Sequence, residues 1–103
     1  MKKYQLALQW PASSIDDYDL LIRTENILIE RLSRANEVDG HDAGSGEVNI
    51  FIRTDDPRRA FGEVKAILGS YDCWGNTRAA YREVIGSEYI VLWPEDLAHF
   101  KVA

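Results

Sequence analysis

The sequence has few of the features that usually reveal a function. It contains a single cysteine, Cys73, so no disulfide bond can form within the chain. No stretch approaches the roughly 18 consecutive apolar residues of a membrane-spanning helix, and residues 1–20 lack the apolar run of a signal peptide. These absences argue against a disulfide-stabilised secreted protein and against a membrane partner. We therefore expect a soluble, cytoplasmic protein.

Basic residues are also in short supply. The chain has 12 Lys and Arg residues against 17 Asp and Glu residues, a formal net charge of −5, and no basic tail or block. Neutralisation of phosphates by basic residues supplies much of the affinity for nucleic acids. We therefore expect no nucleic-acid partner, whereas a basic protein partner would suit the charge of this chain.

Motifs for metal or nucleotide chemistry are missing as well. The segment Gly44-Ser45-Gly46 precedes a predicted strand rather than a helix, so it is no phosphate-binding loop. His41 has no second histidine at metal-binding spacing, and the acidic residues around it do not follow the calcium-loop pattern. The sequence therefore predicts no metal and no cofactor.

Alternation of apolar and polar residues predicts most of the strands. Residues 3–10 alternate, with Tyr4, Leu6, Leu8 and Trp10 on one side, and Pro11 ends this strand because it cannot donate to the ladder. A second alternating strand covers 47–53, preceded by a short edge strand near 37–42. Residues 77–85 and 88–93 are predicted to pair as a hairpin with a tight turn at Gly86-Ser87.

Two helices separate these strands. Ser13 and Ser14 are candidate caps for a helix that runs to about Arg34. The second helix is predicted to start at Asp56 and Pro57, because aspartate favours the cap position and proline the first helical position. Its buried stripe comprises Ala60, Phe61, Val64, Ile67 and Leu68.

The order of these elements predicts the fold class. The pattern β, α, β, β, α, β, β is that of an α+β, ferredoxin-like split β-α-β sandwich. We expect one domain over residues 1–103, with an antiparallel sheet of four to five strands, two helices on one face and a C-terminal β-hairpin. This resemblance concerns the fold alone, and a fold does not decide a function.

The face of the sheet away from the helices is the first candidate site. Alternation places aromatic and arginine side chains on it, a combination that binding surfaces favour. This interpretation makes the protein a non-enzymatic interaction module that forms a homodimer or holds a protein partner, as an inhibitor or a toxin's immunity partner does. The binding residues predicted for this face are Phe51, Arg53, Arg78, Arg82 and Trp93.

A small dimeric ferredoxin-like enzyme or small-ligand binder is the alternative. Its pocket would lie near Trp10, Trp93 and the His41 loop, where two indoles offer apolar walls and the histidine titrates near neutral pH. His41 and Asp42 would then be the candidates for acid–base catalysis. The simpler interpretation of this loop is a polar hairpin whose Asp and Gly residues serve turn geometry. A regulatory domain that works beside others is a third hypothesis.

Overall fold

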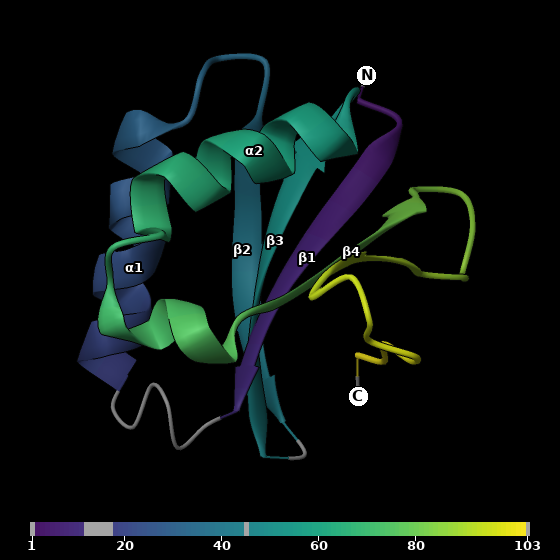
Figure 1. Ribbon diagram of the computed structural model, residues 1–103. Coiled ribbons are helices and arrows are strands. Elements are labelled where there is room, and N and C mark those ends of the chain that lie inside the picture. The colour runs from purple at the N-terminus through teal and green to yellow at the C-terminus, as the bar shows by residue number, and fades with distance from the viewer. Residues whose placement is uncertain (1, 12–17, 45, 103) are drawn as a thin grey trace.

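The alternating strand near the N-terminus becomes the centre of a five-stranded antiparallel sheet. The computed structural model that shows this sheet describes residues 2–11, 18–44 and 46–102. The strands lie in the order β2-β3-β1-β4-β5 (Figure 1). Their bounds are β1, Tyr4–Pro11; β2, Glu37–Gly44; β3, Glu47–Thr54; β4, Arg78–Glu83; and β5, Ile90–Trp93.

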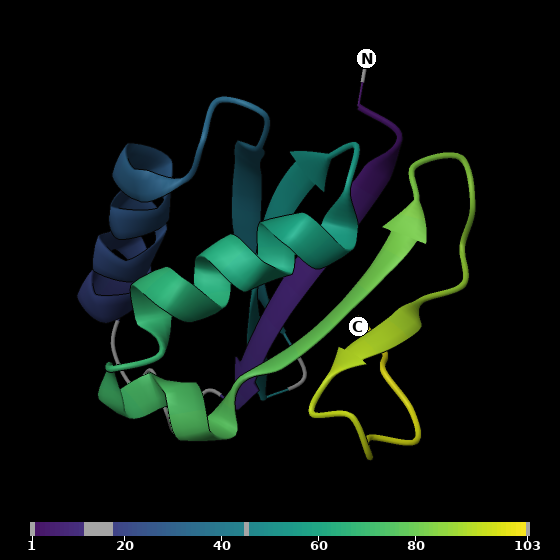
Figure 2. The ribbon, with the colours of Figure 1, turned by 45° about the horizontal axis from the view of Figure 1, so that its top comes forward.

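Both helices pack on the same face of this sheet, as the two views show (Figures 1 and 2). Helix α1, Tyr18–Arg31, connects β1 to β2, and helix α2, Pro57–Leu68, connects β3 to β4 through a 3-10 turn at Asp72–Asn76. The edge strand predicted near 37–42 is confirmed as β2. The predicted caps of the first helix, Ser13 and Ser14, lie outside the described residues.

Helix α2 begins where the sequence predicts. The Asp56 carboxylate accepts a hydrogen bond from the Arg59 backbone N–H at 3.1 Å, and Pro57 occupies the first turn. This arrangement satisfies one of the N–H groups that a helix start leaves without an intrahelical partner. The five apolar residues predicted to face the core are all buried.

The hydrophobic core lies between the helices and the sheet. Trp10 is fully buried there, and its indole N–H donates to the Thr77 hydroxyl at 2.8 Å, so the polar end of this large side chain has a partner. The other fully buried large apolar side chains of this core are Leu6, Leu8, Leu28, Ile50, Ile52, Val64 and Leu68.

The connection between β4 and β5 differs from the predicted tight turn. Strand β4 ends at Glu83 and β5 begins at Ile90, so residues 84–89 form a longer loop. The Arg82 guanidinium holds this loop, because its Nη1 atom donates to the carbonyl oxygens of Glu83, Val84 and Gly86. A backbone hydrogen bond from the Gly86 N–H to the Glu83 carbonyl at 2.9 Å closes a turn at residues 84–85, and the Arg82 side chain within β4 stabilises it.

The Glu63 carboxylate on α2 forms hydrogen bonds with the segment that follows α1. Glu63 accepts hydrogen bonds from both the backbone N–H and the hydroxyl of Ser33, each at 2.9 Å. These bonds, with the one from the backbone N–H as the largest cause, lower the pKa of the Glu63 carboxyl from its ordinary value of 4.5. The ionised carboxylate therefore stabilises the contact between the end of α1 and α2.

We predict that Glu63→Gln lowers the free energy of unfolding by about 1 kcal/mol at pH 7, because an amide keeps only one acceptor oxygen for Ser33. A carboxyl with a lowered folded-state pKa contributes stability above its unfolded-state pKa and loses it as the pH falls through the folded-state value. The difference in free energy of unfolding between wild type and Glu63→Gln, measured by urea unfolding, should therefore be smaller at about pH 3 than at pH 7. Glu30→Gln, at an exposed helix position, is the control. A difference that stays constant between the two pH values would contradict this assignment.

Candidate functional site

The face of the sheet opposite the helices, here called the open face, contains most of the predicted binding residues. Because Leu6, Leu8, Ile50 and Ile52 face the core, the alternate residues of β1 and β3 face the other way. The register places Gln5 beside both Arg53 and Arg82 on the two neighbouring strands. The prediction of a shared face is therefore confirmed for these arginines.

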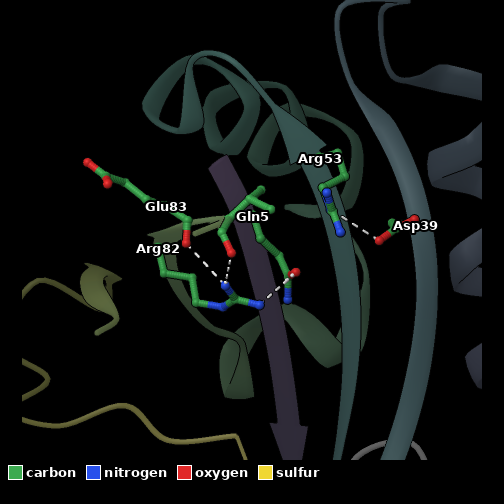
Figure 3. Close-up of polar contacts among 6 residues, drawn as sticks. Gln5, Asp39, Arg53, Arg82 and Glu83 are labelled. Atoms are coloured by element: carbon green, nitrogen blue, oxygen red, sulfur yellow. Dashed lines mark hydrogen bonds and ion pairs between the residues drawn. The ribbon is translucent and has the colours of Figure 1, made fainter. Parts of the chain in front are cut away.

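Arg82 lies across this face and is anchored at both ends of its guanidinium (Figure 3). One terminal nitrogen donates to three backbone carbonyls, at the end of β4 and in the β4–β5 loop, and the other donates to Gln5 Oε1 at 3.2 Å. Its Cζ also lies 5.9 Å from the centre of the Tyr89 ring. These contacts give Arg82 a structural role, since they use its planar fork to join β1, β4 and the loop.

Arg53 is directed toward the edge strand instead (Figure 3). Its Nε atom lies 3.2 Å from Asp39 Oδ2, which is an ion-pair distance, although the alignment is not that of a hydrogen bond. Asp39 reaches this position at an irregularity in the pairing of β2 with β3, between Val38 and Gly40. The ion pair is 31% and 40% exposed at its two side chains, so water screens it in part.

A row of polar side chains crosses the other end of the open face. Gln9 Nε2 donates to Asn49 Oδ1 at 3.1 Å, and Asn49 Nδ2 donates to Asp42 Oδ1 at 2.9 Å. Gln9 Nε2 also donates to the backbone carbonyl of Lys101 at 2.8 Å, which places the C-terminal segment against this end of β1. Gln9 and Asn49 are 1% and 2% exposed, so this end of the face is closed over β1 and β3, whereas Asp42 on β2 is exposed. Arg78, beside Gln9 on β4, pairs with Glu47 at 3.5 Å.

Phe51 occupies the middle of the open face. It stands opposite Ala7 on β1 and Gly40 on β2, two residues too small to cover its ring. Phe51 is partly exposed, whereas Ala7 beside it is fully buried. The aromatic ring therefore offers an apolar contact between the ion pair of Arg53 at one end and the polar row at the other.

Trp93 does not join this face, contrary to the prediction from alternation. Its ring lies 6.0 Å from that of Phe61 and 6.1 Å from that of Trp74, with Lys65 Nζ 4.5 Å above it, so it packs on the helix side. The cause is an irregularity in the β4–β5 pairing, where Trp93 stands opposite Ala79 but Val91 opposite Ala80. The extra residue turns Trp93 to the other face.

His41 and Asp42 project to opposite faces of the sheet, because they are neighbours on strand β2. His41 Nδ1 lies 3.0 Å from Glu25 Oε2 of helix α1, whereas Asp42 accepts from Asn49 on the open face. They therefore cannot act together on one substrate, as the acid–base hypothesis requires. Within the described residues, the predicted polar hairpin is an antiparallel strand pair, and His41 and Asp42 lie within its strand β2.

Three cavities among the described residues lie away from the expected pocket. Trp10 is fully buried, and none of these three cavities is lined by Trp10, Trp93 or His41. The first, of about 600 Å³, is lined in part by Tyr4 and Tyr81. Sequence reasoning missed it because strand alternation assigns both tyrosines to the helix side, and only the tertiary structure shows where α2 stops covering them.

Comparisons with known proteins give no functional assignment. No protein-family model, curated protein or solved structure matches the chain. The described part of the chain contains no group of three or more His, Cys, Asp or Glu residues that could hold a metal ion. No helix within the described residues is long and apolar enough to span a membrane.

We predict that Arg82→Lys lowers the free energy of unfolding by about 1–2 kcal/mol, because an ammonium group cannot reproduce the fork that reaches Gln5 and three carbonyls. Amide hydrogen exchange in residues 84–89 should become faster. Arg23→Lys, on the exposed side of α1, is the matched control and should leave both measurements unchanged. Equal stability of Arg82→Lys and wild type would show that these hydrogen bonds do not hold the loop.

Proposed function

We propose that this protein is a non-enzymatic protein-interaction module that self-associates through the open face of its sheet. The observation that supports this proposal is Phe51, a partly exposed aromatic ring between two small residues in the middle of that face. Aromatic residues within a polar rim are typical anchors of protein interfaces. The rim is formed by the Arg53–Asp39 pair and by the row from Gln9 to Asp42.

We also infer that the fold is of the ferredoxin-like split β-α-β kind, with β5 added at one edge. The strand order β2-β3-β1-β4, with helices between β1 and β2 and between β3 and β4, supports this inference. Such a sheet has one face covered by helices, and the second face is free to meet a partner. Here the C-terminal segment contacts this face through the Lys101 carbonyl at Gln9, and its Phe100 ring packs on Tyr89, which lies beside Arg82.

Charge distribution along the open face suggests one geometry for the dimer. Arg53 lies at one end of the strip around Phe51 and Asp42 at the other. A two-fold axis that crosses the strands at Phe51 would stack the two rings and direct the Arg53 of each copy toward the Asp42 of the other. An axis along the strands would instead bring the two arginines together, which like charges disfavour.

Arg78, Arg82 and Trp93 have different places in this proposal. Arg78 is 42% exposed at its side chain and lies near the closed end of the face. Arg82 supports the surface through its bonds to Gln5 and the loop. Trp93 packs beneath the sheet on the helix side, so it would contribute stability rather than contact a second copy.

We predict that the wild-type chain is a dimer in light scattering and that Phe51→Glu raises the dissociation constant roughly a hundredfold. The substitution enters an isologous interface twice and would place two unpaired carboxylates in it. Circular dichroism should show the same fold for both proteins, because Phe51 is partly exposed.

Ile29→Glu is the matched control, since Ile29 is 56% exposed on helix α1, away from the open face. It introduces the same charge at another apolar surface residue and should leave the dimer intact. A wild-type monomer at millimolar chain concentration would rule out self-association, and equal effects of the two substitutions would rule out the open face as its surface.

Asp42→Asn tests the orientation of the axis. An amide oxygen can still accept from Asn49 Nδ2, but the charge that would face Arg53 of the second copy is removed. We expect the dissociation constant to rise several-fold and to depend less on salt concentration. A tighter dimer in Asp42→Asn would contradict the axis across the strands, because that result means like charges meet at this position.

A further inference from the structure

A groove on the helix side of the sheet has the properties of a second binding surface. It is the cavity of about 600 Å³ between the start of α2 and the β4–β5 connection. Tyr4 and Tyr81 contribute two rings to its floor in an edge-to-face contact, with centroids 5.8 Å apart and planes at 79°. Helix α2 does not cover these rings, because it begins only at Pro57, at the border of the groove.

Exposed isoleucines extend this apolar floor. Ile90 lines the groove and is 51% exposed. A neighbouring hollow of about 440 Å³ shares Tyr4 and Glu83 with the groove, and it is lined by Ile85, which is 92% exposed, and by the two lysines at positions 2 and 3. Isolated apolar residues on a surface need no explanation, but exposed apolar residues that line two adjoining hollows are typical of surfaces that bind proteins.

The rim of the groove is acidic. It carries the carboxylates of Asp55, Asp56, Glu83 and Glu88 against the single guanidinium of Arg58. Asp55 accepts from the Lys3 backbone N–H and Asp56 caps α2, so both have local partners. Glu83 and Glu88 are exposed, and neither forms an ion pair with another described residue. Their charge is therefore available to a ligand.

We propose that this groove binds a basic segment of a partner protein. An apolar or aromatic side chain of that segment would lie on the rings of Tyr4 and Tyr81, and flanking lysine or arginine side chains would approach Glu83 and Glu88. Charge complementarity selects this occupant, since an acidic segment would meet four carboxylates. The tyrosine rings add to the preference, because aromatic faces attract cations.

This site is separate from the proposed dimer surface. Tyr4 and Tyr81 lie on the side of the sheet that carries the core, because they alternate in phase with Leu6 and Ala79, whereas Phe51 lies on the opposite face. A dimer formed through the open face would leave both grooves accessible. Binding of the basic segment and self-association can therefore be tested independently.

The test is a selection of random twelve-residue peptides, displayed on phage, against the immobilised wild-type protein. We expect the enriched peptides to combine an aromatic or large aliphatic residue with neighbouring lysines or arginines. A synthetic copy of the most enriched peptide, followed by fluorescence anisotropy, should bind about tenfold more weakly to the double variant Glu83→Lys and Glu88→Lys. Its affinity should also fall with rising salt.

Two controls make the result specific. Phe51→Glu should bind the peptide as wild type does, even where it abolishes the dimer. Glu30→Lys combined with Glu37→Lys makes the same change of charge at exposed positions elsewhere and should also bind normally. A selection that enriches no peptides or enriches acidic ones would overturn the proposal, and so would equal loss of affinity in the two lysine variants. Because the carboxylates of Glu83 and Glu88 are exposed, both variants should fold.

Discussion

Burial of β1 on both of its faces is the constraint on which the rest of the structure depends. Every residue from Gln5 to Trp10 is buried, because β1 is the middle strand and lies between β3 and β4. Its apolar side chains are covered by the helices, but Gln5 and Gln9 point the other way and must find hydrogen-bond partners there. Arg82 donates a hydrogen bond to the Gln5 side chain. Gln9 donates to the Asn49 side chain and to the Lys101 carbonyl.

This requirement shapes the surfaces that remain for binding. Satisfying the two glutamines uses the Arg82 guanidinium and part of the C-terminal segment, so much of the open face is occupied by the chain itself. Phe51 remains partly exposed because its neighbours Ala7 and Gly40 are small. On the helix side, the rings of Tyr4 and Tyr81 remain accessible past the start of α2. The two proposed surfaces are thus the places that the internal contacts leave free.

Local sequence patterns predicted the helices and strands well, but they predicted the register and connection of the strands less well. Asp56 and Pro57 predicted the start of α2, because a cap and a restricted φ angle act within one turn of the chain. Trp93 was assigned to the wrong face, because a one-residue irregularity between β4 and β5 reverses the alternation. The prediction of a tight turn at Gly86-Ser87 was also wrong, since the connection spans residues 84–89 and its backbone turn, between Glu83 and Gly86, is supported by Arg82.

The sequence by itself determined the α+β class, the order of the elements and the shared face of Phe51, Arg53 and Arg82, since alternation and helical periodicity follow from local geometry. Only the tertiary structure decided which of these side chains are already engaged. It also separated His41 from Asp42 and revealed the groove over Tyr4 and Tyr81. Those properties depend on contacts between residues far apart in the chain, where strand register, helix length and the path of the C-terminal segment act together.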